Sequence, residues 1–303
     1  MSPIRVTARA GLAGLELDRS ADPALSGLMA ALERVAHDPS ITFDDLRADF
    51  VRQTASLPVR DDVVVTPTEV VGRPAELMEP AEVVRTGVYL HGGAYTIGSL
   101  DTVRALAAQV AATTRSRLLV LDYRLAPEHP FPAAVDDAVG ALAWVRDRAD
   151  GLPVVLLGDS AGGSLALQTA LTADVGPDAV VAMSPWTDLS LPFGEAMDAC
   201  VDPQAPRWML ERSAEAYAAG PAGSPRHGDL GALPPSLVQV GTAETLLDDG
   251  LAFAGVAFDA GAPVTLEVWA GMPHVWQAFA PRLAPGVEAL ESADTWLTEV
   301  LGG

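Results

Sequence analysis

The sequence has no lysine and no asparagine, and its 303 residues include a single cysteine, Cys200. Without lysine the chain cannot form a Schiff base with a carbonyl substrate, nor supply the lysine of a phosphate-binding loop. Without asparagine it offers no acceptor for N-glycosylation. One cysteine allows no intramolecular disulfide and excludes a cysteine-rich metal site, so we expect Cys200 to be a structural thiol.

Positive charge is also scarce, because 19 arginines stand against 40 acidic residues and the net charge is −21. Such a charge repels nucleic acid and anionic membranes, so we expect neither as a partner. No apolar run is long enough to predict a transmembrane helix, and residues 1–10 are not followed by the apolar segment of a signal peptide. These features predict a cytoplasmic protein.

What the sequence does contain, from about Asp62 onward, is an alternation of short apolar runs with longer amphipathic segments. Helices are predicted at 102–112, with Asp101 as N-cap, and at 133–148 and 164–173. Strands are predicted at 63–66, 86–90, 118–121, 154–157, 179–183, 237–240 and 264–269. This alternation is typical of an α/β fold with a mostly parallel sheet and helices on both faces.

Two segments interrupt the alternation. Residues 1–50 have a helical pattern, and residues 187–228 are rich in proline, glycine and alanine, with a helix predicted from Pro206 to Ala219. Inserted segments of this kind commonly form a lid or a substrate wall. We predict that both pack as a helical cap on a core made of residues 51–186 and 229–303. The alternative is that they are ordinary connecting segments with no cap function.

The predicted strand 154–157 leads directly into Gly158-Asp159-Ser160-Ala161-Gly162, and a helix follows. A Gly-x-Ser-x-Gly motif between a strand and a helix is typical of a nucleophile elbow, since its glycines permit the tight turn that exposes the serine hydroxyl. The Ala161 N–H, at the start of the helix, would donate to an oxyanion. The motif alone also occurs as a simple turn, so the flanking elements favour Ser160 as a nucleophile.

A second glycine-rich segment, His91-Gly92-Gly93-Ala94-Tyr95, follows the strand predicted at 86–90. It matches the His-Gly-Gly-Gly type of loop, whose main-chain N–H groups bind an oxyanion, and we expect them from Gly92, Gly93 or Ala94. Ala94 replaces the third glycine but keeps an N–H group. We expect His91 to hold this loop by hydrogen bonds. The alternative is an ordinary glycine-rich turn.

Of the five histidines, His274 is best placed to act as a base, because it follows the last predicted strand at the edge of the sheet where Ser160 lies. The acid should come between serine and histidine in the sequence. Glu244 follows the strand at 237–240 directly, and we predict that it orients His274. Asp248 is the alternative, although an acidic residue there is also explained by the dipole of the next helix.

Together these motifs resemble the hormone-sensitive-lipase-like family of carboxylesterases, the bacterial family IV group. The resemblance covers nearly the whole chain from about residue 60, and it rests on His91–Gly93, Asp122–Ala134, Gly158–Gly163, Ser184–Trp186 and Gly271–His274. It implies an α/β-hydrolase fold with an N-terminal cap, no metal and no organic cofactor. It also implies hydrolysis of esters through Ser160, Glu244 and His274, although aspartate is usual where Glu244 stands.

The resemblance leaves the substrate open between a small-molecule ester and a lactone. A lyase or cyclase on the same fold, and a non-catalytic binding protein, are the other functional classes, and a homodimer is one allowed assembly. We expect structural bracing from the 122–134 loop, with an internal Arg124–Glu128 pair. Four aromatic residues are candidates for the substrate pocket or for the core: Tyr95, Trp186, Trp208 and Trp276.

Overall fold

The computed structural model describes residues 3–12, 15, 17–18, 20–25, 40–55, 57–190, 202–280 and 282–302. Cys200, expected to be a structural thiol, lies outside the described residues. So do residues 26–39 of the predicted N-terminal cap segment and residues 191–201 of the predicted insertion.

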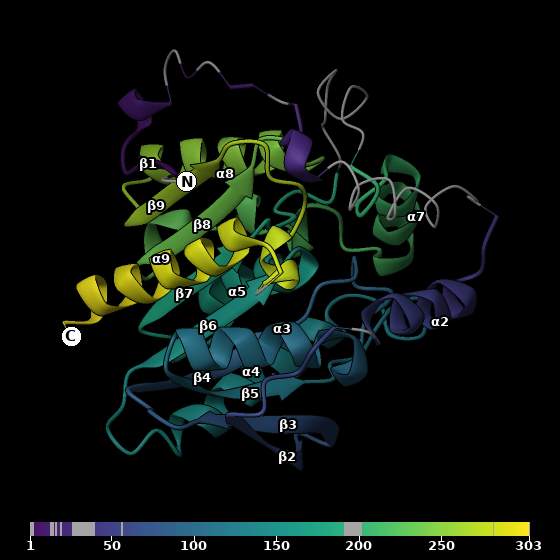
Figure 1. Cartoon of the computed structure of the whole chain (residues 1–303), viewed down its shortest axis with the longest axis vertical. Coiled ribbons are helices and arrows are strands. Elements are labelled where there is room, and N and C mark those ends of the chain that lie inside the picture. The colour runs from purple at the N-terminus through teal and green to yellow at the C-terminus, as the bar shows by residue number, and fades with distance from the viewer. Residues whose placement is uncertain are drawn as a thin grey trace.

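Nine strands form one sheet in the order β1-β9-β8-β7-β6-β4-β5-β3-β2 (Figure 1). The six adjacent strands β9, β8, β7, β6, β4 and β5 are mutually parallel. At the two edges of the sheet, β1, β2 and β3 pair antiparallel with their neighbours. The strands are β1 (Ile4–Val6), β2 (Val63–Val70), β3 (Arg73–Pro80), β4 (Arg85–Leu90), β5 (Ser116–Leu121), β6 (Val154–Asp159), β7 (Ala179–Met183), β8 (Ser236–Gly241) and β9 (Val264–Trp269).

Helices cover both faces of this sheet, as the alternation predicted. One face carries α3 (Leu100–Thr113) and α9 (Ala284–Leu301), and the other carries α4 (Ala133–Arg146), α5 (Ala161–Thr172) and α8 (Leu247–Asp259). Successive strand residues enter opposite cores, so that in β4 Val88 packs on one side and Tyr89 on the other. A sheet buried on both faces explains why its central strands are continuous apolar runs.

Three features differ from the sequence predictions. β1 was not predicted because its three residues are too few to show a hydrophobic period. β3 was not predicted because it contains two prolines and two glutamates. The predicted N-cap Asp101 is wrong, because α3 begins at Leu100 and the N-cap is Ser99, whose N–H donates to Thr102 Oγ1 at 2.9 Å. Several polar residues near the start of a helix can serve as its N-cap, and the backbone conformation determines which of them does so.

The sheet topology creates one crevice near its middle. The chain leaves β4 for β5 on one side, and later returns to place β6 on the other side of β4. At such a switch point the connections diverge at the carboxyl ends of the strands and leave room for a ligand. The predicted nucleophile follows β6 and the predicted oxyanion loop follows β4, so both lie at this crevice.

Two further helices, α2 (Phe43–Thr54) and α7 (Arg207–Tyr217), lie together beyond this end of the sheet (Figure 1). Both contribute side chains to the cavity that contains Ser160. Within the ranges that the structure describes, no helix combines the length and the apolar character needed to cross a membrane.

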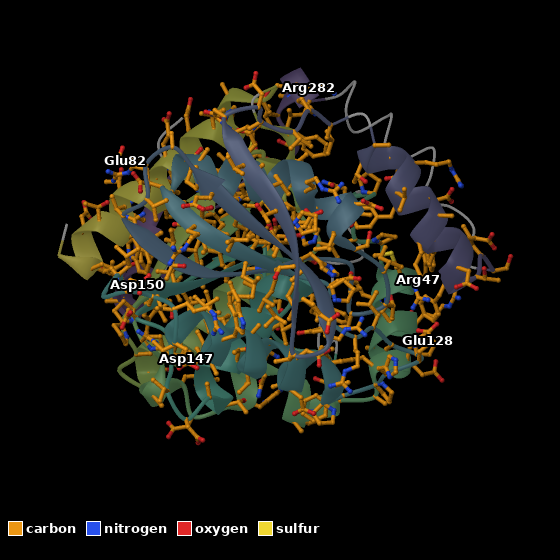
Figure 2. The ribbon with its side chains drawn as sticks, turned by 90° about the horizontal axis from the view of Figure 1, so that it is seen from below. Arg47, Glu82, Glu128, Asp147, Asp150 and Arg282 are labelled. Carbon is orange, nitrogen blue, oxygen red and sulfur yellow. The ribbon has the colours of Figure 1, made fainter. Side chains whose placement is uncertain are left out.

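Arg47 fixes α2 to the core (Figure 2). Its guanidinium makes a two-pronged ion pair with Glu128, at 2.7 and 2.9 Å, and also donates to the main-chain carbonyls of Thr96 and Ala126. The expected Arg124–Glu128 pair is therefore wrong, because Arg124 instead binds Asp137, with a shortest contact of 2.7 Å. Charge-assisted, bidentate contacts of this kind are the strong ones.

We expect Arg47→Ala to lower the free energy of unfolding by about 1–3 kcal/mol, because it leaves Glu128 and two carbonyls without their donor. Arg52→Ala on the same helix is the control and should cost less than about 0.5 kcal/mol, since Arg52 is 67% exposed. Denaturant unfolding of the purified variants measures both, and equal losses would contradict this role of Arg47.

The Arg47–Glu128 ion pair also makes the free energy of unfolding depend on pH. Arg47 lowers the pKa of Glu128 from 4.5 to about 2, so its stabilising effect is present above pH 4.5 and is lost as the pH falls toward 2. The stability difference between the wild type and Glu128→Gln should shrink over that range.

Candidate active site

Ser160 lies on a strained turn between β6 and α5. Its backbone has φ +53° and ψ −122°, a left-handed conformation that is rare for a residue with a side chain, and α5 begins with the next residue. A Cβ at Gly162 would lie 2.0 Å from the Leu90 carbonyl oxygen, so only glycine permits this approach of the helix to β4. The turn places the hydroxyl of Ser160 at the crevice.

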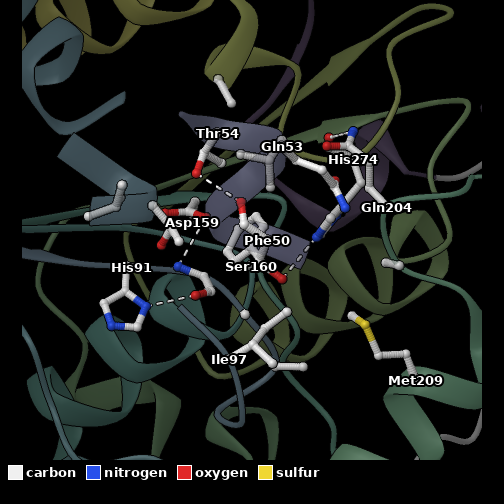
Figure 3. A pocket seen from close by; sticks show the side chains of 18 of the residues that line it. Phe50, Gln53, Thr54, His91, Ile97, Asp159, Ser160, Gln204, Met209 and His274 are labelled. Atoms are coloured by element: carbon white, nitrogen blue, oxygen red, sulfur yellow. Dashed lines mark hydrogen bonds between the residues drawn. The ribbon is translucent and has the colours of Figure 1, made fainter. Parts of the chain in front are cut away.

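His274, in the loop after β9, reaches this hydroxyl. Its Nε2 lies 2.9 Å from Ser160 Oγ, although the two residues are 114 positions apart in the sequence (Figure 3). Both side chains are buried, and burial lowers the pKa of His274 to about 3. The imidazole is therefore neutral at physiological pH and is able to accept the proton of the serine.

Glu244 lies on the far side of the imidazole. Its Oε2 is 4.0 Å from His274 Nδ1 and accepts hydrogen bonds from Ser184 Oγ, at 2.6 Å, and from the Gly241 N–H. Glu244 Oε1 and His274 Nδ1 are both buried without a hydrogen-bond partner. Since catalytic hydrogen bonds often tighten only when substrate binds, the arrangement favours Glu244 as the orienting acid.

The alternative acid, Asp248, lies in the first turn of α8 and is only partly buried. Its position is accounted for by the helix dipole. Burial raises the pKa of Glu244 well above its usual range, whereas a carboxylate close to a forming imidazolium would favour the charged form.

The loop after β4 presents main-chain N–H groups to the same place. The Gly92 N–H donates to Asp159 Oδ2 at 3.1 Å, so the expectation that Gly92 binds an oxyanion is wrong. Among the described residues, the N–H groups of Gly93, Ala94 and Ala161 make no hydrogen bond to a loop or turn carbonyl, and we expect these three to be the oxyanion donors. Ala94 has φ +51°, so the residue that replaces glycine adopts a backbone conformation that glycine favours.

His91 braces this loop, as expected. Its Nδ1 lies 2.7 Å from the Gly92 carbonyl oxygen, and its ring stacks on Tyr123 with a centroid separation of 4.2 Å. The Tyr123 hydroxyl donates to the His91 carbonyl at 2.6 Å. Burial lowers the pKa of His91 to about 4, so this ring is neutral as well. The segment 122–134 thus contributes structural bracing.

A cavity of about 200 Å³ opens above Ser160, and most of its wall is apolar. Of the four aromatic candidates only Trp208 lines it. Tyr95, Trp186 and Trp276 do not line this cavity but are fully buried and pack against other side chains, so for them the core alternative holds. The wall is formed mainly by side chains that the sequence reading did not single out, among them Leu46, Phe50, Ile97, Leu106, Met209 and Phe279.

Comparison with known proteins identifies the family to which this architecture belongs. A family model described as the α/β-hydrolase fold matches residues 87–278, which is more than half of the chain. The chain belongs to the α/β-hydrolase family.

Within this α/β-hydrolase family the chain resembles bacterial esterases. It is 42% identical over 247 residues to an acetyl-hydrolase from Streptomyces hygroscopicus, covering 75% of this chain and 80% of the relative. It is 32% identical over 258 residues to an esterase from Acinetobacter venetianus, covering 80% and 84%. The crystal structure of an esterase from the bacterial hormone-sensitive lipase family superposes with a TM-score of 0.85 at 38% identity, covering 92% and 99%.

These findings confirm the expected resemblance to the hormone-sensitive-lipase family and the expected fold. Within the described part of this hydrolase, no three His, Cys, Asp or Glu side chains are grouped as they would be around a metal ion. Independence from a metal or organic cofactor stays a prediction.

Two residues that the sequence reading left without a role lie next to the site. Asp159 binds Gly92, and Ser184 binds Glu244 while accepting the Val275 N–H at 3.1 Å. Ser184 follows β7, the strand between β6 and β8, so its place at the shared edge of the sheet was the available signal.

We expect Glu244→Gln to lower kcat by about 10³- to 10⁴-fold, because a neutral amide neither orients the imidazole nor stabilises its protonated form. Asp248→Asn is the matched control and should change kcat by less than about tenfold. Steady-state hydrolysis of p-nitrophenyl acetate measures both. A larger loss in the Asp248 variant would reverse the assignment of the acid.

We expect Gly93→Ala to lower kcat by about 10²- to 10³-fold, because the added Cβ would displace the main-chain N–H of residue 93 from the oxyanion. Gly93 has φ +120°, and a Cβ there would lie 2.2 Å from the Ile97 carbonyl oxygen. Ala94→Gly keeps its N–H in a conformation that glycine adopts freely, so its kcat should stay within about tenfold of the wild type. Equal losses in the two variants would contradict this assignment of donors.

Proposed function

We propose that this protein hydrolyses carboxylic esters of small or medium size through Ser160, His274 and Glu244, by way of an acyl-enzyme. The observation that carries the proposal is the 2.9 Å contact between His274 Nε2 and Ser160 Oγ, in a cavity that Gly93 and Ala94 of the glycine-rich loop also line. Ester hydrolysis is also the activity named for the relatives, which are esterases, carboxylesterases and acetyl-hydrolases.

In the first half of the reaction, Ser160 Oγ attacks the ester carbonyl while His274 accepts its proton. The negative charge that develops on the carbonyl oxygen is stabilised by the N–H groups of Gly93, Ala94 and Ala161, each of which contributes about 3 kcal/mol when removal of one donor is the measure. His274 then protonates the departing alcohol. In the second half, His274 activates a water molecule that releases the acid from Ser160.

The cavity sets the class of substrate. Apart from the histidines, its charged lining residues among those the structure describes are Asp49 and Asp159, and no arginine lines it. An anionic acyl or alcohol group would meet negative charge in an apolar wall, which costs free energy. We therefore propose a neutral ester as substrate, with a lactone as the second candidate, because ring opening uses the same chemistry.

We also propose that α2 and α7 are parts of a cap over the catalytic core, because both line the cavity above Ser160. The boundaries expected at residues 50, 186 and 228 stay predictions, and α2 continues to Thr54. A cytoplasmic location, a homodimer and the lack of a nucleic-acid partner stay predictions too.

We expect the wild type to hydrolyse p-nitrophenyl acetate and to react covalently with a fluorophosphonate probe, and Ser160→Ala to do neither. Intact-protein mass spectrometry measures the probe adduct. Ester hydrolysis by Ser160→Ala at the wild-type rate would overturn the proposed nucleophile. An unlabelled wild type would instead favour the non-catalytic binding protein, and an unsaturated product would favour the lyase.

A further inference from the structure

We propose that Asp202 and Gln204, in the turn that precedes α7, are positioning residues that clamp the main chain of His274 and so couple the cavity wall to the catalytic base. This inference rests on the proposed function, and it assigns a role to residues that do not touch the reacting atoms.

The clamp consists of hydrogen bonds to both main-chain polar groups of His274. Asp202 Oδ2 accepts the His274 N–H at 2.9 Å, and Gln204 Nε2 donates to the His274 carbonyl oxygen at 2.5 Å. Asp202 Oδ1 accepts the Gln204 N–H at 3.0 Å, which ties the two clamp residues to each other. Figure 3 shows Gln204 beside His274, on the side away from His91.

The base needs such support because its loop has little regular structure. His274 lies beyond the end of β9, two residues before a short 3₁₀ helix that begins at Trp276. Gly271 before it and Val275 after it both have positive φ. Val275 donates its N–H to Ser184 rather than to a neighbouring strand. The orientation of the imidazole thus depends on side chains that bind this loop from outside.

Asp202 is an unusual residue for a purely structural turn. It is a carboxylate that is only 3% exposed, and burial raises its pKa to about 6, while the N–H groups of Gln204, His274 and Thr245 favour its charged form. Thr245 follows Glu244 directly in the chain. Asp202 therefore faces the loops that carry the acid and the base, and it would hold their spacing.

The same turn forms part of the substrate wall. Pro203, Gln204 and Ala205 line the cavity, and α7 continues the wall with Trp208 and Met209. A displacement of the wall is therefore transmitted to His274 through two hydrogen bonds. Since a misplacement of about 1 Å can cost about 10²-fold in rate, the clamp matters for the chemical step more than for binding.

The test compares Asp202→Ala, Asp202→Asn and Gln204→Ala with a control on the cap, Glu211→Gln. Glu211 is half-exposed on α7 and forms an ion pair with Arg207 one turn away, at 2.7 Å. For each variant we would measure kcat and KM with p-nitrophenyl acetate, the rate of labelling by a fluorophosphonate probe, and the thermal midpoint.

We expect Asp202→Ala to lower kcat by about 10- to 100-fold and to slow labelling to the same extent, with KM changed by less than about threefold. Asp202→Asn should fall between it and the wild type, because an amide keeps one acceptor oxygen. Gln204→Ala should lose about threefold to tenfold in kcat, the value of one hydrogen bond. Glu211→Gln should match the wild type.

A merely structural role predicts a different pattern, in which the thermal midpoint falls while kcat and the labelling rate of the folded fraction stay at the wild-type values. That result, or a loss confined to KM, would overturn the clamp. Should Asp202→Ala not fold, the same readouts on Asp202→Asn and Gln204→Ala decide. An unlabelled wild type would overturn the proposed function, whereas a labelled wild type with equal labelling of the clamp variants would overturn the clamp alone.

Discussion

The close approach of α5 to the end of β4 is the constraint on which the site depends. Leu90, the last residue of β4, pairs with Gly158 of β6, and its carbonyl oxygen would collide with any side chain at Gly162. Because these glycines bring the two elements together, the residue after β6 and the loop after β4 share one crevice. The strain at Ser160 and the orientation of the N–H groups both follow from that contact.

A second constraint is that the carboxylates around the site are buried, so that each must be matched by hydrogen-bond donors. Asp159 receives the Tyr89 hydroxyl and the Gly92 N–H, and Glu244 receives Ser184 and the Gly241 N–H. Burial still raises the pKa of Asp159 to about 6, which shows that desolvation outweighs these bonds. Such carboxylates hold loops in place as hydrogen-bond acceptors.

The sequence was sufficient for those features that are encoded locally. The position of Ser160 at the crevice could be predicted because a strand, two glycines and a helix surround it, and that of His274 because it follows the last long strand. Features set by distant contacts were missed. Whether Trp186 and Trp276 face the cavity or the core depends on packing that no local pattern records, and the partner of Glu128 is a residue of α2 some 81 positions away. Gly92 was misassigned because its acceptor, Asp159, lies on another strand.

The helices α2 and α7, which we propose as parts of a cap, also contact the glycine-rich loop after β4. Three successive residues of the oxyanion loop, Gly93 to Tyr95, have positive φ, a conformation that persists only when its surroundings enforce it. Contacts from α2 and α7 support this loop: Tyr217 of α7 stacks on Tyr95 at 4.0 Å, Ser213 of α7 makes a hydrogen bond with Thr96 at 2.9 Å, and Arg47 of α2 donates to the Thr96 carbonyl. Elements that form the substrate wall therefore also support the strained loop, so the binding surface and the oxyanion donors cannot be altered independently.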